Sequence, residues 1–253
     1  MIIACLQVRL KSKRFPKKAM VNVKNKPLFL HVAERINSSK KVDKLIICTS
    51  KNKQDLPIID VCKKQNIEYF AGEEDDVVKR YIDAVSKYEP DHIVRVTGDN
   101  PCVSFEFIDL AIKEHLSKNS KYTTTDDLPR GMRSEIIDFN FLRNLHVKLV
   151  DPAMTEYMSW YLDRPDKWKV VKVNMPQKLK RSHYRLTVDK KIDLDVIKKV
   201  YDVLYKGTSI DSYKIVKFLD ENQDVVMLNS SIKQRLHNDL KDKVDIRTFD
   251  EVS

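Results

Sequence analysis

Short apolar runs alternate with amphipathic segments through the first half of the chain. Four apolar runs have the length of buried strands, and these are residues 1–7, 44–50, 67–72 and 91–99. Each is followed by a segment with apolar residues at helical spacing, and these are residues 26–39, 55–65, 73–88 and 104–119. Strands that alternate with helices are typical of a largely parallel sheet. The pattern therefore predicts a doubly wound α/β fold.

This regularity weakens in the second half. Further strands are predicted at residues 121–127, 133–139, 167–175 and 182–189, the first two as a pair around the turn "LPRG". Further helices are predicted at residues 151–163, 193–205 and 211–243. No repeat or Gly/Ser linker separates these elements. We expect one domain over residues 1–205, with residues 206–253 as a helical extension packed on it.

The charge of the chain adds a class of partner to this picture. A formal net charge of +10 over 253 residues points to anionic partners, which include nucleic acid, an acidic membrane surface and small phosphorylated ligands. The four cysteines show no CxxC spacing, which predicts a reducing compartment without disulfides or a zinc site. No apolar run reaches the roughly 18 residues of a membrane span. We expect a soluble, cytoplasmic protein without a membrane partner.

A basic loop follows the first predicted strand. The stretch "RLKSKRFPKKAM", residues 9–20, contains six basic residues and lies where parallel sheets bind ligands. Its Arg and Lys side chains could hold a polyphosphate, although neither GxGxxG nor a P-loop is present. A solvated surface loop is the simpler alternative. Nucleic-acid binding is disfavoured because the loop offers one aromatic residue, Phe15, for stacking bases.

Two aspartates occupy comparable places at predicted strand ends. Asp99 follows Gly98 in "VRVTGDNP", and Asp189 ends the segment "YRLTVD". Mg²⁺ prefers oxygen ligands and commonly takes one or two carboxylates together with phosphates and water. Either aspartate alone could instead be a helix N-cap. Their occurrence beside a basic loop favours a magnesium site.

The combination resembles the cytidylyltransferases of the spore-coat polysaccharide type, which are relatives of CMP-Kdo and CMP-sialic acid synthetases. The stretches that carry the resemblance are "QVRLKSKRFPKKAM", "NKPLFLHVAERI", "AGEEDDVVKRY", "VRVTGDNP" and "YRLTVDKKIDLDVIKKVY". They cover residues 1 to about 205, and the C-terminal "DIRTFDEVS" lies outside. The resemblance implies a GT-A-like α/β nucleotidyltransferase with a mostly parallel, doubly wound sheet and a small antiparallel and helical decoration. It also implies a homodimer that transfers CMP from CTP to a small anionic acceptor and releases pyrophosphate.

The resemblance also implies roles for individual residues. Catalytic roles would fall to Arg9, Arg14 and Lys18. Contacts with the nucleotide would come from Leu6, Val8, Arg9, Ser12, Arg14, Lys18, Asp76, Arg80, Thr97 and Gly98. Mg²⁺ would be held by Asp99 and Asp189.

Two departures from the family pattern bear on the acceptor and on the loop. The family's "GLDVE" is "GMRSE" here, so Arg133 replaces an acid, and Lys11 and Lys17 stand where family loops carry glycines. We expect Arg130, Arg133, Ser134 and Glu135 to bind the acceptor. Paired arginines suit a dianionic phosphonate such as 2-aminoethylphosphonate, with Glu135 or Asp126 for its ammonium.

Other interpretations stay open at this point. Arg133 could simply pair with Glu135 or Asp138 on the surface. The acceptor could be a sugar acid of surface polysaccharide biosynthesis. From other classes, the chain could be a basic nucleic-acid-binding module or an inactive nucleotide-binding scaffold.

Overall fold

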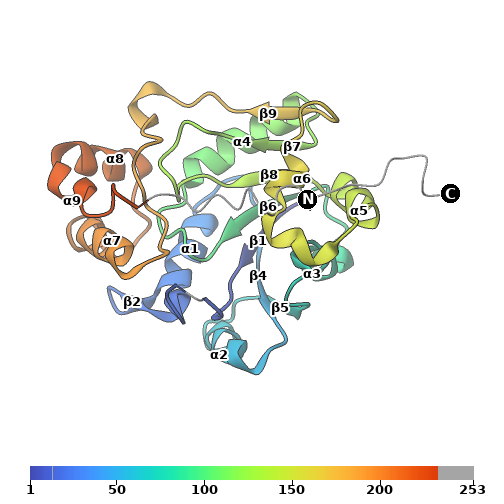
Figure 1. Ribbon diagram of the computed structural model, residues 1–253, viewed down its shortest axis with the longest axis horizontal. Helices are drawn as coiled ribbons and strands as arrows, with labels where there is room; N and C mark the ends of the chain where they lie inside the picture. Colours follow the sequence, from blue (N-terminus) through green and yellow to red (C-terminus); the bar gives the residue numbers. More distant parts are fainter. Residues whose placement is uncertain (13, 233–253) are drawn as a thin grey trace.

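The computed structural model describes residues 1–12 and 14–232, and this part of the chain forms a seven-stranded sheet with helices on both faces (Figure 1). The strand order is β5-β4-β1-β6-β8-β7-β9. The strands are β1 (Ile2–Gln7), β4 (Lys44–Ser50), β5 (Tyr69–Gly72), β6 (His92–Thr97), β7 (Tyr122–Thr124), β8 (Glu135–Asp138) and β9 (Val170–Lys172). A separate two-stranded hairpin joins β2 (Asn22–Val23) and β3 (Lys26–Pro27).

The helices form two layers around the sheet. They are α1 (Leu28–Asn37), α2 (Leu56–Lys64), α3 (Val77–Val85), α4 (Phe105–Ser117), α5 (Phe139–Val147), α6 (Ser159–Leu162), α7 (Lys191–Leu204), α8 (Ser212–Glu221) and α9 (Gln223–Met227). Short 3₁₀ segments are η1 (Lys18–Met20), η2 (Lys53–Asp55), η3 (Ser86–Tyr88), η4 (Pro152–Tyr157) and η5 (Gln177–Leu179). Along β1, Ala4 and Leu6 pack with α1, α4 and α7, whereas Ile3 and Cys5 pack with α3 and α5. This alternation of side chains confirms the predicted doubly wound α/β fold.

The strand pair predicted around the turn "LPRG" is confirmed. Strands β7 and β8 pair antiparallel, with Tyr122 opposite Ile137, and β8 also pairs antiparallel with β6. The other pairings in the sheet are parallel. Strand β8 is therefore the antiparallel decoration that the sequence predicts.

Three predictions of local structure are wrong. Residues 151–163 form the 3₁₀ segment η4 and the one-turn helix α6 rather than a continuous helix. The helix predicted to begin at residue 73 begins later, because Asp76 is the N-cap of α3 and the acids of residues 73–75 precede it. Residues 182–189 are not a strand, because their ladder to the turn after β7 consists of a single bridge between Arg130 and Arg185.

The carboxyl ends of β1 and β6 meet at one edge of the sheet. Gln7 lies opposite Thr97 in the register of this pair, and the amide of Gly98 donates to the carbonyl of Gln7 at 2.8 Å. A Cβ on Gly98 would lie 3.0 Å from Val8 Cγ2 and 3.2 Å from that carbonyl. Glycine therefore allows the two strand ends to approach closely where the loops leave the sheet.

The segment after α7 is tied to the main body by a buried arginine. Arg35 of α1 donates to the carbonyls of Val103 and Ile210 and to Ser212 Oγ at 3.2 Å. These contacts join α1 to the start of α8. The boundary at residue 205 stays a prediction, and residues 233–253, which include "DIRTFDEVS", lie outside the described residues. None of the helices in the described part of the chain has both the length and the apolarity needed to cross a membrane.

A buried histidine pair opposes protonation in the folded state. His115 Nε2 lies 3.2 Å from His92 Nδ1, and His115 Nδ1 lies 2.8 Å from Thr123 Oγ1. Burial and the neighbouring His92 lower the pKa of His115 to about 4, from an ordinary value of 6.5. Burial also lowers the pKa of His92. Below pH 6.5 the unfolded chain therefore binds more protons at these two histidines than the folded chain does.

We expect this pair to reduce the free energy of unfolding as pH falls from 6.5 to about 4. His115→Gln should remove a part of that loss, on the order of 2 kcal/mol, because its unfolded state no longer gains the proton. Urea denaturation near neutral pH and in the acid window measures the difference. His183→Gln, at an exposed position, is the control, and an unchanged pH dependence in His115→Gln would contradict the assignment.

Candidate active site

The basic loop is held at both of its ends by hydrogen bonds. The amide of Leu10 donates to Asp55 Oδ1 at 2.7 Å, and the amide of Lys17 donates to the carbonyl of Leu10 at 3.1 Å. Lys17 has φ 57°, in the left-handed region that glycine adopts most easily. This backbone conformation explains why a glycine is expected there, and the exposed Lys17 side chain plays no part in the cavity lining.

A cavity of about 580 Å³ opens between this loop and the ends of β1 and β6. Its lining brings together most of the residues predicted for the nucleotide and the metal, namely Val8, Arg9, Ser12, Arg14, Lys18, Thr97, Gly98, Asp99 and Asp189. Arg9 crosses the cavity wall, where its Nη1 donates to the carbonyl of Glu74 at 2.8 Å and its Nη2 pairs with Glu156 at 3.0 Å. We call this space the nucleotide cavity.

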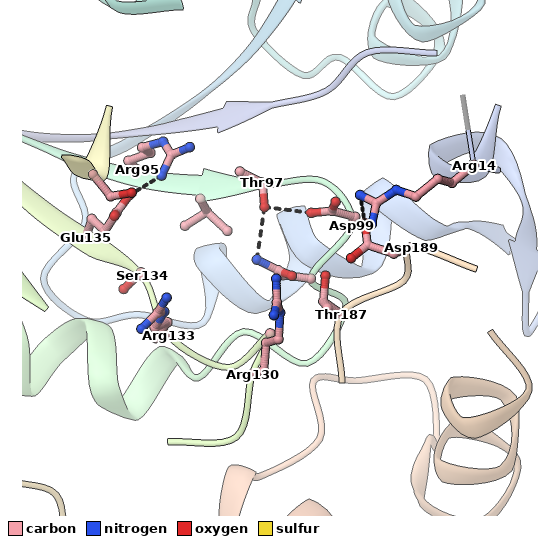
Figure 2. Close-up of a pocket in the computed structure, with 14 residues that line it drawn as sticks. Arg14, Arg95, Thr97, Asp99, Arg130, Arg133, Ser134, Glu135, Thr187 and Asp189 are labelled. Carbon is pink, nitrogen blue, oxygen red and sulfur yellow. Dashed lines mark hydrogen bonds and ion pairs between the residues drawn. The ribbon is translucent and has the colours of Figure 1, made fainter. Parts of the chain in front are cut away.

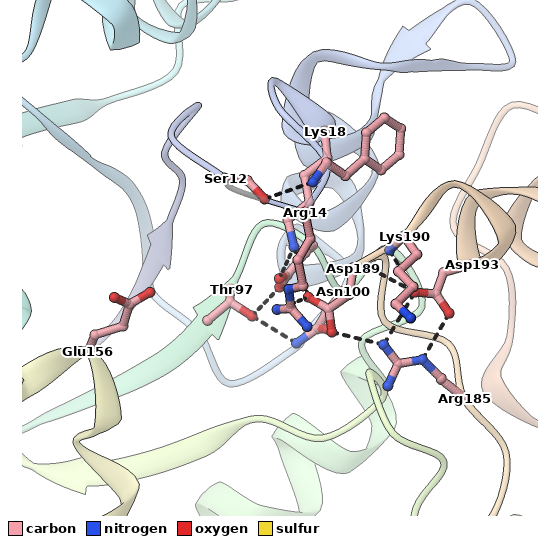
Figure 3. Close-up of polar contacts among 12 residues, drawn as sticks. Ser12, Arg14, Lys18, Thr97, Asn100, Glu156, Arg185, Asp189, Lys190 and Asp193 are labelled. Carbon is pink, nitrogen blue, oxygen red and sulfur yellow. Dashed lines mark hydrogen bonds and ion pairs between the residues drawn. The ribbon is translucent and has the colours of Figure 1, made fainter. Parts of the chain in front are cut away.

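Two carboxylates in this cavity share one ammonium. Lys18 Nζ lies 2.7 Å from Asp99 Oδ2 and 3.1 Å from Asp189 Oδ1, and Arg14 Nη2 lies 2.8 Å from the same oxygen of Asp189 (Figure 3). Burial opposes the charge of Asp189, but Lys18 and Arg14 outweigh it and lower the pKa of the carboxyl. Burial likewise opposes the charge of Lys18, and the two aspartates raise its pKa. The shifts of these two pKa values, downward for Asp189 and upward for Lys18, both favour the charged forms.

A second ion pair fixes the other carboxylate oxygen of Asp189. Arg185 Nη2 donates to Asp189 Oδ2 at 2.9 Å, and Arg185 Nε donates to Asp193 Oδ1 at 2.8 Å. Asp193 Oδ2 accepts from the amides of Asp189 and Lys190, both at 2.9 Å. Asp193 therefore caps the start of α7 and holds in place the backbone of Asp189, one of the two residues predicted to bind the metal.

The turn between β7 and β8 lines a second cavity of about 270 Å³ that meets the nucleotide cavity at Asp99 and Asp189 (Figure 2). The four residues predicted for the acceptor, Arg130, Arg133, Ser134 and Glu135, all line it. In Figure 2, Arg133 and Ser134 lie on one side of the view and Asp189 lies on the other, with Arg130 between the two sides. Ser134 Oγ is buried without a hydrogen-bond partner in the described chain. We call this space the acceptor cavity.

Glu135 differs from its predicted role as a receptor for an ammonium. Its carboxylate is bound by Arg95 and accepts from the hydroxyl of Tyr122 at 2.6 Å. Burial opposes the charge of Glu135, but Arg95 outweighs burial and lowers the pKa of Glu135. Burial also opposes the charge of Arg95, and Glu135 outweighs it and raises the pKa of Arg95. Glu135 is therefore already neutralised and not free for a ligand ammonium.

The two arginines of the turn have different surroundings. Arg133 pairs with Asp126 at 3.3 Å, and both side chains are half or more exposed, so this contact adds little stability. The alternative pairing of Arg133 with Glu135 or Asp138 does not occur. The guanidinium of Arg130 makes no hydrogen bond or ion pair with the described residues. It is therefore a cation available to an anionic ligand.

Three residues predicted to contact the nucleotide lie outside the cavity lining. Leu6 is fully buried in the core. Arg80 is also buried, and its Nη1 donates to the carbonyls of Glu73 and Glu74. Asp76 caps α3 and binds His146. In this geometry the three residues support the wall, and their contact with the nucleotide stays a prediction.

Several lining residues are missed by sequence reasoning. They are Arg95, Asn100, Glu156, Tyr157, Ser159 and Thr187. A signal was present for Arg95, since a charged residue inside the otherwise apolar run "HIVRVT" implies a buried partner. Asn100 Nδ2 donates to Thr97 Oγ1 at 2.9 Å, and Thr97 Oγ1 donates to Asp99 Oδ1 at 2.6 Å. These bonds orient Asp99, and nothing in the pattern of the sequence marks them.

Known proteins resemble this chain in both sequence and fold. The sequence model of a family described as cytidylyltransferase matches residues 3–231, further than the 205 residues expected. An uncharacterized protein of Methanocaldococcus jannaschii is 31% identical over 245 residues, which are 95% of this chain and 99% of that protein. The spore coat polysaccharide biosynthesis protein SpsF of Bacillus subtilis is 28% identical over 229 residues, 88% and 95% of the two chains. A solved cytidylyltransferase from Leptospira borgpetersenii has a similar fold, with TM-score 0.81, 24% identity and coverage of 92% and 98%.

Gly131 provides a test of how the arginine turn is positioned. Its φ is +96°, and a Cβ there would lie 2.5 Å from the amide nitrogen of Thr187 and 2.6 Å from the carbonyl carbon of Leu186. Gly207 has nearly the same conformation, with φ +94°, but nothing lies within 4 Å of the position that a Cβ would take there. The two glycines therefore separate backbone strain from steric overlap.

We expect Gly131→Ala to lower the free energy of unfolding by clearly more than Gly207→Ala. The left-handed backbone alone costs an alanine about 1 kcal/mol, and only Gly131 adds overlap with the neighbouring backbone. Urea denaturation of both variants measures the difference. An equal loss in the two variants would show that the turn after β7 can move away from residues 186–187.

Proposed function

This chain belongs to the cytidylyltransferase family, and from that membership we propose that it transfers CMP from CTP, with Mg²⁺, to a phosphonate acceptor such as 2-aminoethylphosphonate. Pyrophosphate is the second product. The observation that carries the proposal is the meeting of a basic loop, two carboxylates and an arginine-lined cavity at one sheet edge. This arrangement is suited to phosphoryl transfer, which requires positioning and charge neutralisation more than a covalent nucleophile.

The triphosphate of CTP would lie in the nucleotide cavity against Arg9, Arg14 and Lys18. Arg14 and Lys18 form ion pairs with the two metal candidates, Lys18 with both Asp99 and Asp189 and Arg14 with Asp189. Binding therefore requires these cations to exchange carboxylate oxygens for phosphate oxygens, which are similar acceptors. Arg9 is fixed by the carbonyl of Glu74 and keeps its place in the wall.

Mg²⁺ fits the residues present. Asp99 and Asp189 approach a single cation, Lys18 Nζ, at 2.7 Å and 3.1 Å, so their oxygens already converge on one positive charge. Within the described residues no group of three or more His, Cys, Asp or Glu side chains could hold a metal, so further ligands would come from phosphate and water. When bound, Mg²⁺ supplies neutralisation of phosphate charge.

The acceptor would attack from the acceptor cavity. One of its anionic oxygens forms a bond to the α-phosphorus, the bond to the bridging oxygen breaks, and pyrophosphate leaves with the electron pair. An ionised phosphonate needs no general base for this step. Arg130 and Arg133 offset the repulsion between the acceptor and the triphosphate, because guanidinium groups bind oxyanions in a planar, two-point manner.

A sugar acid is the second candidate acceptor, and one observation favours it. The carboxylates that line the acceptor cavity are Asp99, Asp189 and Glu135, and each is already bound to Lys18, Arg14 or Arg95. No carboxylate of the described lining is thus left for the ammonium of 2-aminoethylphosphonate. The relative in Bacillus subtilis is named for polysaccharide biosynthesis, where sugar acids occur.

The homodimer stays a prediction, and light scattering of the purified chain would test it.

We expect Asp99→Asn and Asp189→Asn each to reduce turnover about 100-fold or more, because each variant loses one metal ligand and one ion pair to Lys18. Pyrophosphate release with CTP and Mg²⁺ measures the effect for 2-aminoethylphosphonate and for 3-deoxy-manno-octulosonate as the sugar acid. Asp202→Asn, on the exposed side of α7, is the control. Full activity in either site variant would refute the metal assignment, and no release with either acceptor would refute the proposed acceptors.

Adjacent lysines offer a matched pair for the triphosphate contact. Lys18→Met should raise the KM for CTP about tenfold or more, because one charge-assisted contact is lost. Lys17→Gly should leave the KM for CTP within about twofold, since its side chain is exposed and glycine adopts φ 57° readily. Initial rates of pyrophosphate release over a range of CTP concentrations measure both. A larger effect at Lys17 than at Lys18 would contradict the assigned roles.

A further inference from the structure

A third cavity of about 290 Å³ lies beyond the arginines of the acceptor cavity. It shares Arg130 and Arg133 with the acceptor cavity, and its other lining residues come from the turn after β7, the segment before α7 and the segment that follows α9. The full lining is Asp126, Leu128, Arg130, Arg133, Ser182, His183, Tyr184, Arg185, Asn229, Ser230 and Ile232. We call it the distal cavity.

Cations outnumber carboxylates in this lining. Three arginines line the distal cavity, and the one carboxylate among its lining residues belongs to Asp126. Asp126 is largely exposed and is shared between Arg133 and Lys172, each at 3.3 Å. Arg130 has no partner in the described chain, and the hydrogen bonds of Arg185 use Nε and Nη2 but leave Nη1 without one. Arg185 is already neutralised by Asp189 and Asp193, so the lining offers an anion the guanidinium of Arg130 and the unused Nη1 of Arg185.

The surroundings of Arg130 penalise its charge. Burial lowers the pKa of its guanidinium, and the neighbouring charge of Arg185 lowers it further, while Asp189 acts in the opposite direction. A partly buried cation beside other cations is stabilised when an anion enters. Arg130 and Arg133 border both cavities, whereas Arg185 lines the distal cavity and not the acceptor cavity, so an anion in the acceptor cavity leaves the free Nη1 of Arg185 unused.

The walls of the distal cavity are held in place before any ligand binds. Asn229 Nδ2 donates to the carbonyl of Arg185 at 3.1 Å and to Asp193 Oδ1 at 2.9 Å. The hydroxyl of Tyr184 donates to Asp220 at 2.7 Å, so α8 is joined to the same wall. Asn229 is nearly fully buried, as is Arg185 at 9% exposure. The C-terminal segment thus forms one side of a pre-organised site.

We infer that the distal cavity binds a second oxyanion of the acceptor, a carboxylate or a phosphate, joined to the attacking group by a chain that runs past Arg130 and Arg133. This inference rests on the proposed function, since it names a subclass of its acceptors. 2-Aminoethylphosphonate fills the acceptor cavity alone, whereas a phosphonate or sugar acid with a second acidic group also neutralises the distal arginines.

Two phosphonates of matched length test the inference. 4-Phosphonobutanoate carries a carboxylate at the far end, and butylphosphonate carries a methyl group there. We expect a KM about tenfold lower for 4-phosphonobutanoate, because one charge-assisted contact is worth at least that factor. Ser182→Asp, which places a carboxylate in the distal lining, should remove this preference. Ser182→Asn has nearly the same shape without the charge and should retain it.

Calorimetry without CTP separates this inference from the proposed function. Titration of 4-phosphonobutanoate and of butylphosphonate into the full chain, wild type and both Ser182 variants, measures binding whether or not CMP is transferred. Tighter binding of 4-phosphonobutanoate that Ser182→Asp alone removes supports the distal site, even if no phosphonate is turned over. Equal binding of the two phosphonates, or a preference that Ser182→Asp leaves intact, overturns it even if both are substrates.

Discussion

The site depends on keeping two like charges close together. Asp99 follows β6 and Asp189 precedes α7, and the two carboxylates repel each other unless cations lie between them. Lys18 supplies the shared cation, at 2.7 Å and 3.1 Å, Arg14 binds the same oxygen of Asp189 as Lys18, and Arg185 binds the other oxygen. A backbone bond from the amide of Val188 to the carbonyl of Asp99, at 2.8 Å, fixes the same separation without charge. Removal of the cations would therefore strain the junction that joins the two halves of the site.

The proposed triphosphate contact would give the basic loop a second set of partners. The ammonium and guanidinium groups that neutralise the two aspartates are the groups proposed to bind triphosphate. An exchange of one set of oxyanions for another keeps the number of charge-assisted contacts nearly constant, so the change need not cost much free energy. The rigid parts are the backbone anchors, with Leu10 bound to Asp55 and Arg9 bound to the carbonyl of Glu74. The proposed exchange would therefore move the long side chains and leave the loop that carries them in place.

The alternation of apolar runs and amphipathic segments was sufficient to predict the sheet and the edge at which the site lies. It failed for residues 182–189, whose backbone is divided between bonds to Arg130 and to Asp99 and so forms no ladder. Periodicity reports which side chains are buried, and it does not report which backbone receives the hydrogen bonds. Partners far away in sequence are hidden in the same way. Glu135 looked available for a ligand, yet Arg95, 40 residues earlier, binds it across the β6–β8 pair.

These contacts show where in the site the basic residues are paired with carboxylates and where they are not. Around the nucleotide cavity the basic residues are matched by Asp99, Asp189, Glu74 and Glu156, so that region is nearly neutral before ligands bind. Around Arg130 and Arg133 the matching is incomplete, because Arg185 is used to position Asp189 and Asp126 is shared with Lys172. Selectivity for an anionic acceptor would then arise where the protein leaves its own charge uncompensated, beside a wall that Asn229 fixes through its bonds to the carbonyl of Arg185 and to Asp193.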